Sequence, residues 1–186
     1  MGRPKAWLPF GEEFMLPRVV RLLSEAVTPI VVVAAVGQEL PTLPGDVEVV
    51  LDEERTRGPL QGLAAGLAAL AGRVDAAFAS SCDVPFLRSA FVKRMIELVG
   101  AHQICVPKVG DFHHPLAAVY RLEVLAAVRS LLEADRLRPM FLFDAVPTRV
   151  VSADELHGVD ATLESLRNLN TPEDYAAALR DLKHIE

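Results

Sequence analysis

Residues 29–37, PIVVVAAVG, form a short, almost uninterrupted apolar run that is rich in β-branched side chains. Pro29 and Gly37 bound the run on its two sides. Polar residues do not alternate with the apolar ones along this run, so neither face of the strand would be polar. This pattern is typical of a parallel strand covered by helices on both faces. We therefore predict a strand here that is buried on both sides.

Predicted strands and helices alternate around this run. Strands are predicted at residues 47–51, 75–81, 103–108 and 115–121, and helices at about 17–26, 59–72, 89–99 and 122–132. Alternation of this kind implies right-handed crossovers between strands of one sheet. The expected fold class is therefore α/β, with a Rossmann-like, mostly parallel sheet and helices on both faces.

The composition limits the classes of protein to which the chain can belong. A chain of 186 residues with 51% hydrophobic residues can bury a substantial core, so we expect a single domain over residues 1–186. A net charge of -6 argues against a nucleic-acid partner, and the apolar runs are far shorter than the roughly 18 residues of a membrane span. Cys82 and Cys105 are too few for a disulfide framework. We expect a cytoplasmic protein with no membrane partner.

Ligands of such sheets bind at the carboxyl ends of the strands, and one candidate segment there is LDEERTRGPLQG (51–62). Asp52 ends a predicted strand, and Gly58 and Pro59 lead into a helix whose free N–H groups favour an anion. Taken by itself, this segment is better explained as an ordinary strand-to-helix turn.

The segment SSCDVPFL (80–87) is a sharper candidate. Asp83 directly follows an apolar strand, where its carboxylate could hold Mg²⁺ together with phosphate oxygens. Capping of the next helix or turn by Asp83 has nearly equal weight. Cys82 fits a small core residue better than a nucleophile.

Two further segments carry polar side chains near predicted strand ends or helix starts. In NLNTPEDYAAALRDL (168–182), Thr171 is the predicted N-cap of a helix. Asn168 and Asn170 precede it and could contact a heterocycle or complete a metal shell, although turn formation is the commoner use of asparagine. His113 and His114 lack the further ligands of a zinc site, and we expect them to be exposed.

Five segments, taken in order, resemble the molybdenum cofactor guanylyltransferases, a family of nucleotidyltransferases with one α/β domain of the nucleotide-diphospho-sugar transferase type. The segments are MGRPKAWLPFG (1–11), LDEERTRGPLQGLAAGLAAL (51–70), SSCDVPFL (80–87), HHPLAAVYR (113–121) and NLNTPEDY (168–175). Each segment by itself is only moderately specific for the family, but the five segments in this order are strong evidence for the resemblance. The resemblance implies Mg²⁺-dependent transfer of GMP from GTP to the terminal phosphate of molybdopterin, which releases pyrophosphate and forms molybdopterin guanine dinucleotide.

The resemblance also implies roles for individual residues. Lys5 would neutralise the triphosphate, and Asp83 would hold Mg²⁺ and share the catalytic role with Lys5. Asn168 and Asn170 would face molybdopterin. Without the family pattern, Lys5 would be interpreted as a solvated loop charge.

The same resemblance places Asp52, Gly58 and Gly62 against the nucleotide. Ala34 and Ala35 stand where the family often has an asparagine for the nucleotide, so recognition of the base is expected to differ. A related cytidylyltransferase or other nucleotidyltransferase, and a non-catalytic cofactor-binding homologue, remain alternatives. Other proteins of cofactor synthesis, or acceptors of the cofactor, are candidate partners.

In the family, a strand and a glycine-rich phosphate loop precede the lysine loop that includes Lys5. The present sequence starts at the MG of that loop. The expectation is that an N-terminal strand and phosphate loop lie upstream of Met1, so that the domain as given is truncated at its N-terminus.

Overall fold

The computed structural model describes residues 4–52 and 58–183. Its helices are α1 (Met15–Ser24), α2 (Gly58–Leu70), α3 (Ser89–Leu98), α4 (Leu125–Glu133), α5 (Met140–Ala145) and α6 (Pro172–Leu182). Its strands are β1 (Pro9–Phe10), β2 (Glu13–Phe14), β3 (Val31–Ala35), β4 (Glu48–Asp52), β5 (Ala76–Ser80), β6 (Ile104–Val109), β7 (Phe112–His113), β8 (Ala117–Arg121) and β9 (Thr148–Ser152). Short 3-10 turns are η1 (Lys5–Trp7), η2 (Leu122–Val124) and η3 (Glu164–Leu166). Every predicted strand and helix is present, whereas the short elements β1, β2, β7, α5 and β9 were not predicted.

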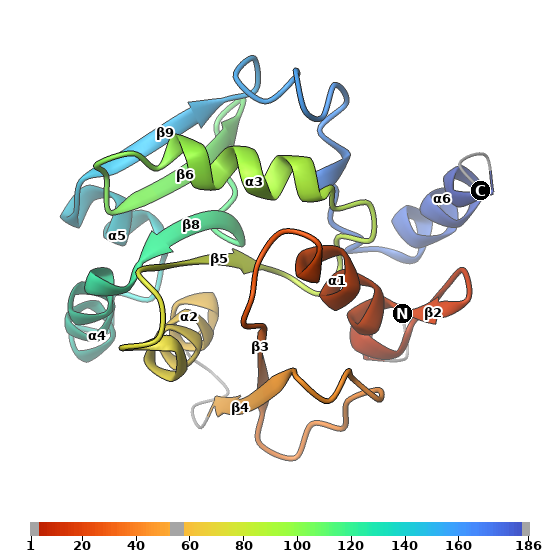
Figure 1. Ribbon diagram of the computed structural model, residues 1–186, viewed down its shortest axis with the longest axis horizontal. Coiled ribbons are helices and arrows are strands. Elements are labelled where there is room, and N and C mark those ends of the chain that lie inside the picture. Colours follow the sequence, from red (N-terminus) through yellow and green to blue (C-terminus); the bar gives the residue numbers. More distant parts are fainter. Residues whose placement is uncertain (1–3, 53–57, 184–186) are drawn as a thin grey trace.

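The larger sheet has five strands in the order β5-β8-β6-β7, with β9 paired to β6 (Figure 1). The expected α/β alternation is confirmed, but this sheet is mixed and not mostly parallel. β8 is antiparallel to both β5 and β6, and β9 is parallel to β6. The reason is the connection from β6 to β8, which contains the short strand β7 and no helix. A connection this short returns the chain antiparallel, whereas a parallel neighbour requires a longer crossover.

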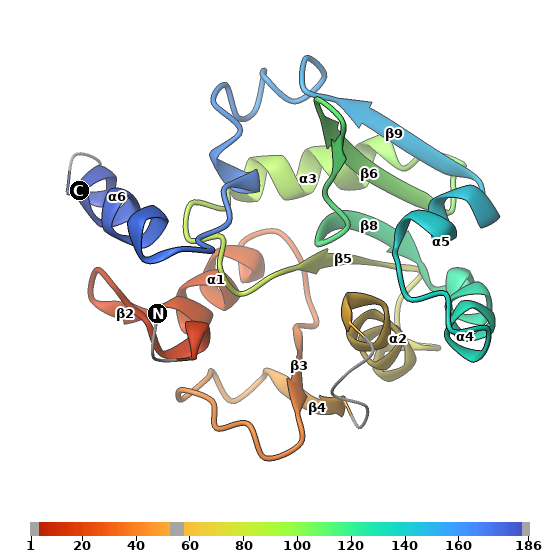
Figure 2. The ribbon, with the colours of Figure 1, turned by 180° about the vertical axis from the view of Figure 1, so that it is seen from behind.

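The second sheet consists of β3 and β4, paired in parallel from Val31 opposite Glu48 to Ala35 opposite Asp52. Figures 1 and 2 both show it standing apart from β5, with α1 and α2 on either side. The prediction that residues 29–37 form a strand buried on both sides is correct for the strand and wrong for its burial. Only Ala34 of β3 is buried, because a cavity of about 740 Å³ separates β3 from β5.

Helices cover both faces of the larger sheet, as predicted. On one face, α3 contributes Phe91 and Met95 to a core that includes Cys105 and Val119. On the other face, α2, α4 and α5 pack on side chains that alternate with these along the strands. Tyr120 is fully buried there, next to Val119 in sequence but on the opposite face.

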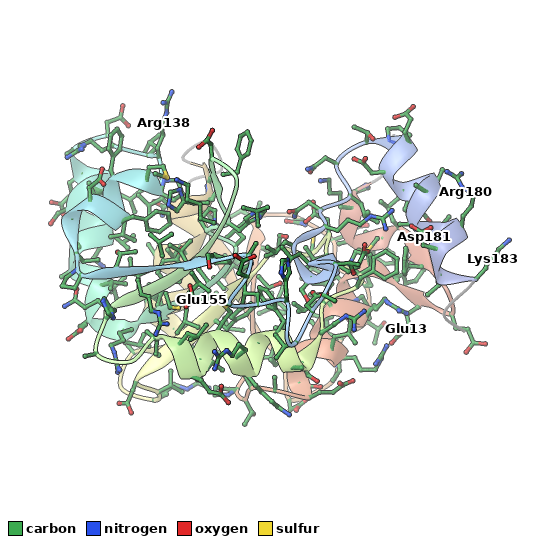
Figure 3. All side chains as sticks on the ribbon, turned by 90° about the horizontal axis from the view of Figure 1, so that it is seen from above. Glu13, Arg138, Glu155, Arg180, Asp181 and Lys183 are labelled. Carbon is green, nitrogen blue, oxygen red and sulfur yellow. The ribbon has the colours of Figure 1, made fainter. Side chains whose placement is uncertain are left out.

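A third, smaller core joins the two ends of the chain. Phe10 and Met15 pack with Leu169, Ala178 and Leu182. Figure 3 shows that α6, which carries Arg180 and Asp181 and is followed by Lys183, lies at the end of the molecule opposite Arg138. This packing places the segment before α6 beside the N-terminal loop.

The start of α6 is fixed locally, as the sequence predicted. Thr171 accepts from the Asp174 N–H, the Asp174 carboxylate accepts from the Thr171 N–H, and Pro172 occupies the first turn. In the described ranges 4–52 and 58–183, no helix has the length and apolar character needed to cross a membrane.

Candidate active site

Three segments that are distant in sequence meet at the carboxyl end of β5. The lysine loop is held by the small core around Phe10 and Met15, and the segment 168–170 is held by Leu169 in the same core. The Leu169 N–H also donates to the Asp83 carbonyl at 3.0 Å, which fastens this segment to the loop after β5. The fold therefore brings Lys5, Asp83, Asn168 and Asn170 together.

The polar side chains form a connected group, here called the Lys5–Asp83 cluster and defined as Lys5, Ser81, Asp83, Asn168 and Asn170. The Lys5 Nζ donates to Asp83 Oδ2 at 2.6 Å and to Asn170 Oδ1 at 2.8 Å. The Asn168 amide donates to Asp83 Oδ1 at 2.7 Å and to the Ser81 Oγ at 2.9 Å. Both oxygens of Asp83 thus accept a hydrogen bond, which fixes the orientation of the carboxylate.

The environment of Asp83 keeps the carboxyl ionised. Burial alone would raise its pKa, because the residue is only 6% exposed. Hydrogen bonds from Lys5, Ser81 and Asn168 outweigh burial, and the net pKa of Asp83 lies below its ordinary value. At neutral pH the site therefore presents a fixed negative charge with a lysine ammonium against it.

These contacts argue against the purely local roles that the sequence left open for four residues. Asp83 does not cap α3, whose N-cap is Arg88 and has no side-chain cap. The side chains of Asn168 and Asn170 bond to residues far away in sequence, and not within a local turn. Lys5 is ion-paired and about one-third exposed, so it is not a freely solvated loop charge.

Cys82 lies beside this cluster but is a poor nucleophile. It packs against Ala6, Leu16 and Val20, as expected for a small core residue. Burial, reinforced by the charge of Asp83, raises the pKa of its thiol.

Asp52, Gly58 and Gly62 lie on the β3–β4 side of the molecule. Asp52 is the last residue of β4 and lines the cavity between β3 and β5. Gly58 is the first residue of α2 and has a φ of +69°, a conformation that favours glycine. Gly62 is inside α2 and faces β3, where an added Cβ would lie 4.0 Å from Val33 Cγ1. Such a distance is an ordinary van der Waals contact, so packing of α2 on β3 does not require glycine at position 62. Residues 53–57 lie outside the described residues.

Ser81 is the member of the cluster that the sequence analysis missed. Its only sequence signal is its position two residues before Asp83. The expectation for His113 and His114 was also wrong, because both side chains are half-buried. The His113 ring lies 5.6 Å from the Phe143 ring, and burial lowers the pKa of both histidines.

A divalent cation would have few protein ligands in this site. Within residues 4–52 and 58–183, no three His, Cys, Asp or Glu side chains are grouped as a metal site. Asp83 Oδ2 and Asn170 Oδ1 nevertheless converge on one point, which the Lys5 ammonium occupies. Two hard oxygen donors at one cationic position suit Mg²⁺ when substrate phosphates supply further ligands.

Comparison with known proteins gives a consistent family. The model of the MobA-like NTP transferase domain matches residues 1–148. A probable molybdenum cofactor guanylyltransferase of Pelotomaculum thermopropionicum is 30% identical over 182 residues, covering 96% of this chain and 85% of the relative. Another, from Mycobacterium bovis, is 36% identical over 160 residues, covering 83% of this chain and 78% of the relative.

The fold agrees with this assignment. The crystal structure of molybdopterin-guanine dinucleotide biosynthesis protein A from Archaeoglobus fulgidus matches with a TM-score of 0.80 at 17% identity, over 98% of this chain and 92% of that one. The nucleotide-diphospho-sugar transferase type of fold, expected from the resemblance, is thereby confirmed. The chain belongs to the MobA-like NTP transferases and is a nucleotidyltransferase related to the molybdenum cofactor guanylyltransferases.

Proposed function

We propose that this nucleotidyltransferase transfers GMP from GTP to the terminal phosphate of molybdopterin. In the reaction, an oxygen of the acceptor phosphate forms a bond to the α-phosphorus of GTP. The bond from that phosphorus to the bridging oxygen breaks on the opposite side, and pyrophosphate leaves with the electron pair. The observation that carries the proposal is the Lys5–Asp83 cluster at the carboxyl end of β5, in a chain whose relatives are named as guanylyltransferases.

Such a transfer requires alignment and neutralisation of charge more than it requires a covalent catalyst. Lys5 supplies a cation that is already desolvated on one side by Asp83 and Asn170. A triphosphate that approached the cluster would compete with Asp83 for the ammonium. We assign Lys5 to neutralising the triphosphate, with Asp52, Gly58 and the neighbouring Gly62 along the nucleotide.

We assign a divalent cation, Mg²⁺, to the Asp83 side of the cluster. The fit rests on the ionised Asp83 carboxylate and on the convergence of its Oδ2 with Asn170 Oδ1. When bound, the ion would supply Lewis-acid stabilisation of phosphate oxygens. Asn168 keeps the carboxylate oriented through Oδ1. We also propose that the Asn168 and Asn170 side chains face molybdopterin with the amide atoms that do not contact Asp83 or Lys5.

The experiment supplies the purified protein with molybdopterin and, separately, GTP, CTP, ATP and UTP, with and without Mg²⁺. Pyrophosphate release and the mass of the dinucleotide product are measured. A guanine dinucleotide formed only with Mg²⁺ is the expected result. A cytosine product would instead establish a related cytidylyltransferase. Binding of molybdopterin without any product would favour the non-catalytic cofactor-binding homologue.

A variant of Lys5 tests the assignment to the triphosphate. Lys5→Ala removes a charge-assisted contact worth about 1.5–3 kcal/mol, so the Kd of GTP should rise by about tenfold or more. Lys108→Ala, on β6, is the matched control. An unchanged GTP affinity in Lys5→Ala would remove Lys5 from the nucleotide site.

We place the reaction in the cytoplasm, with cofactor-synthesis or acceptor proteins as partners that take up the product. The observation behind this placement is that Cys82 and Cys105 are both free thiols.

A further inference from the structure

Two buried polar residues lie outside the Lys5–Asp83 cluster. Among residues 4–52 and 58–183, the buried polar or charged residues are Asp83, Asp160 and Ser165, and the last two are 0% exposed. Asp160 and Ser165 belong to the segment between β9 and α6. A buried carboxylate is costly unless hydrogen bonds compensate for the loss of water. The partners of Asp160 therefore indicate what this residue does.

The Asp160 carboxylate holds the turn that precedes Asn168. Its Oδ1 accepts from the Glu164 N–H at 3.2 Å, and its Oδ2 accepts from the Ser165 N–H at 2.8 Å. The Asp160 carbonyl accepts from the Leu163 N–H at 3.0 Å. Three successive N–H groups thus donate to one residue, which fixes the path of the chain through this turn.

The same turn contains a leucine in the left-handed region of backbone conformation. Leu163 has a φ of 54° and a ψ of 34°. A bulky side chain makes this conformation unfavourable, so it persists only where the surrounding contacts impose it. The N–H of Leu163 and the next N–H along the chain both donate to Asp160. Asp160 therefore maintains a strained turn, and strained turns of this kind are concentrated at functional sites.

A second set of contacts fastens the turn to the start of α3, the helix that follows the Asp83 loop. The Ser165 Oγ accepts from the Arg88 N–H at 3.1 Å. The Arg88 Nε lies 3.5 Å from Asp160 Oδ1. Figures 1 and 2 both show the chain after β9 passing one end of α3 before it enters α6.

The turn and the Asp83 loop are thus joined at two points. Ser165 bonds to the start of α3, and the Leu169 N–H donates to the Asp83 carbonyl. Asn168 lies between these two points and donates to Asp83 Oδ1 at 2.7 Å. Three residues span no more than about 10 Å, so a displacement of the turn at Ser165 would also move Asn168.

We propose that Asp160 is a positioning residue of the Lys5–Asp83 cluster. Its carboxylate fixes the turn at residues 163–165, and this turn determines where Asn168 meets Asp83. The hydrogen bonds of the carboxylate go to backbone N–H groups outside the cluster, so Asp160 acts through the turn. The effect of Asp160 on turnover rests on the proposed function, whereas its effect on the geometry of the cluster does not.

The variant Asp160→Asn tests the effect on geometry in the free protein. The amide keeps the shape of the carboxylate, but its NH₂ group meets one of the two backbone N–H donors. Hydrogen exchange of the Leu169 amide, measured relative to the Val119 amide of β8, should become faster by about tenfold or more. The side-chain amide signals of Asn168 in ¹⁵N spectra should shift, because its contact with Asp83 is displaced.

The variant Val128→Ala is the control for a general loss of stability. Val128 is fully buried on α4, on the face of the larger sheet away from the turn. Its relative exchange at Leu169 and its Asn168 signals should match those of the parent. Parent-like exchange and signals in Asp160→Asn would overturn the proposal, and so would equal changes in Asp160→Asn and Val128→Ala.

The variant Ser165→Ala replaces Asp160→Asn if the latter does not fold. It deletes a single oxygen atom and leaves the Arg88 N–H without its acceptor, which loosens the turn at its other attachment. The Leu169 amide should again exchange faster relative to Val119. Parent-like exchange in Ser165→Ala would overturn the proposal in that case.

Turnover separates positioning from packing. With GTP, molybdopterin and Mg²⁺, kcat of Asp160→Asn should fall by about tenfold or more, with little change in the KM of GTP. The KM of GTP is retained because the lysine loop has its own core around Phe10. Val128→Ala should keep the kcat of the parent at a temperature where both are folded.

The two kinds of measurement also separate this proposal from the proposed function. An active parent whose kcat is unchanged by Asp160→Asn would overturn the positioning role. A folded parent that forms no dinucleotide with GTP would contradict the proposed function. In that case, the exchange rates and amide signals of the free protein still decide whether Asp160 positions the cluster.

Discussion

The five-stranded sheet and the β3–β4 sheet have similar apolar sequences but different packing. β8 lies between β5 and β6, and Ala118, Val119 and Tyr120 at its centre are no more than 1% exposed. β3 is as apolar as β8, yet within residues 4–52 and 58–183 it pairs with β4 alone, and only one of its residues is buried. Burial of a strand therefore depends on its neighbours and not only on its own sequence. The Lys5–Asp83 cluster connects the two regions, because Lys5 comes from the β3 side and Asp83 follows β5.

The largest effect is expected in the closed region. Phe91 of α3 is fully buried against the sheet, and Phe91→Ala should lower the free energy of unfolding by about 3–5 kcal/mol. Phe112→Ala is the control, because Phe112 is 78% exposed and its truncation should change stability by less than about 0.5 kcal/mol. Urea unfolding measures both, and equal costs would show that the sheet is not the stable part of the molecule.

The next effect is on catalysis at the junction of the two regions. Asp83→Asn keeps the shape of the side chain and removes its charge, and kcat should fall by about 10²–10³, as when one preorganised electrostatic group is lost. Asp75→Asn, an exposed position just before the other end of β5, should leave kcat unchanged. Steady-state pyrophosphate release measures kcat of the parent and both variants. Full activity of Asp83→Asn at the same Mg²⁺ concentration would reject Asp83 as the metal ligand.

A matched pair of valines tests the comparison directly. Val119→Ala on β8 should cost about 2 kcal/mol, since it deletes two buried methyl groups. Val33→Ala on β3 should cost less than about 1 kcal/mol in the 186-residue chain, because Val33 borders the cavity. Thermal and urea unfolding of the parent chain and the two variants would show whether the two sheets differ in this way.

A smaller effect on stability is expected at the start of α6, the helix that follows the segment 168–170. Thr171→Ala breaks the capping box of α6 and should lower stability by about 1 kcal/mol. Thr171→Ser keeps the hydroxyl and serves as the control. Calorimetry that found equal losses for both variants would show that the cap hydroxyl is not the stabilising group.

The pH dependence of stability is expected to be the most modest signal. Burial acting alone would raise the pKa of Asp83, but its hydrogen bonds lower the pKa below the ordinary value of about 3.8. A carboxyl whose folded pKa is depressed stabilises the fold above the unfolded value, and this contribution is lost as pH falls through the folded pKa. Stability should therefore decline below about pH 4, and less steeply in Asp83→Asn than in the parent chain. The measurement is an acid titration of both proteins followed by circular dichroism. Identical slopes for the parent chain and Asp83→Asn would contradict a stabilising ion pair between Lys5 and Asp83.

Much of the fold could be predicted because its elements have local causes. The apolar run at 29–37, the helix at 89–99 and the cap at Thr171 were each placed correctly from periodicity and capping residues. The short β7 and β9 were missed because pairing with β6, and not local sequence, makes them strands. The mixed direction of the larger sheet was missed for the same reason, since only the connection from β6 to β8 determines it.

The sequence by itself determined which residue types stand at the strand ends, including Lys5, Asp83, Asn168 and Asn170, because these positions follow from local patterns and an ordered set of motifs. The tertiary structure was needed to show that these four side chains are linked by hydrogen bonds, that Ser81 joins them, and that among the described residues β3 pairs with β4 alone. The physical reason is distance along the chain. Contacts such as that of Lys5 with Asn170, 165 residues apart, form only when the packing of Phe10, Met15 and Leu169 closes the chain on itself.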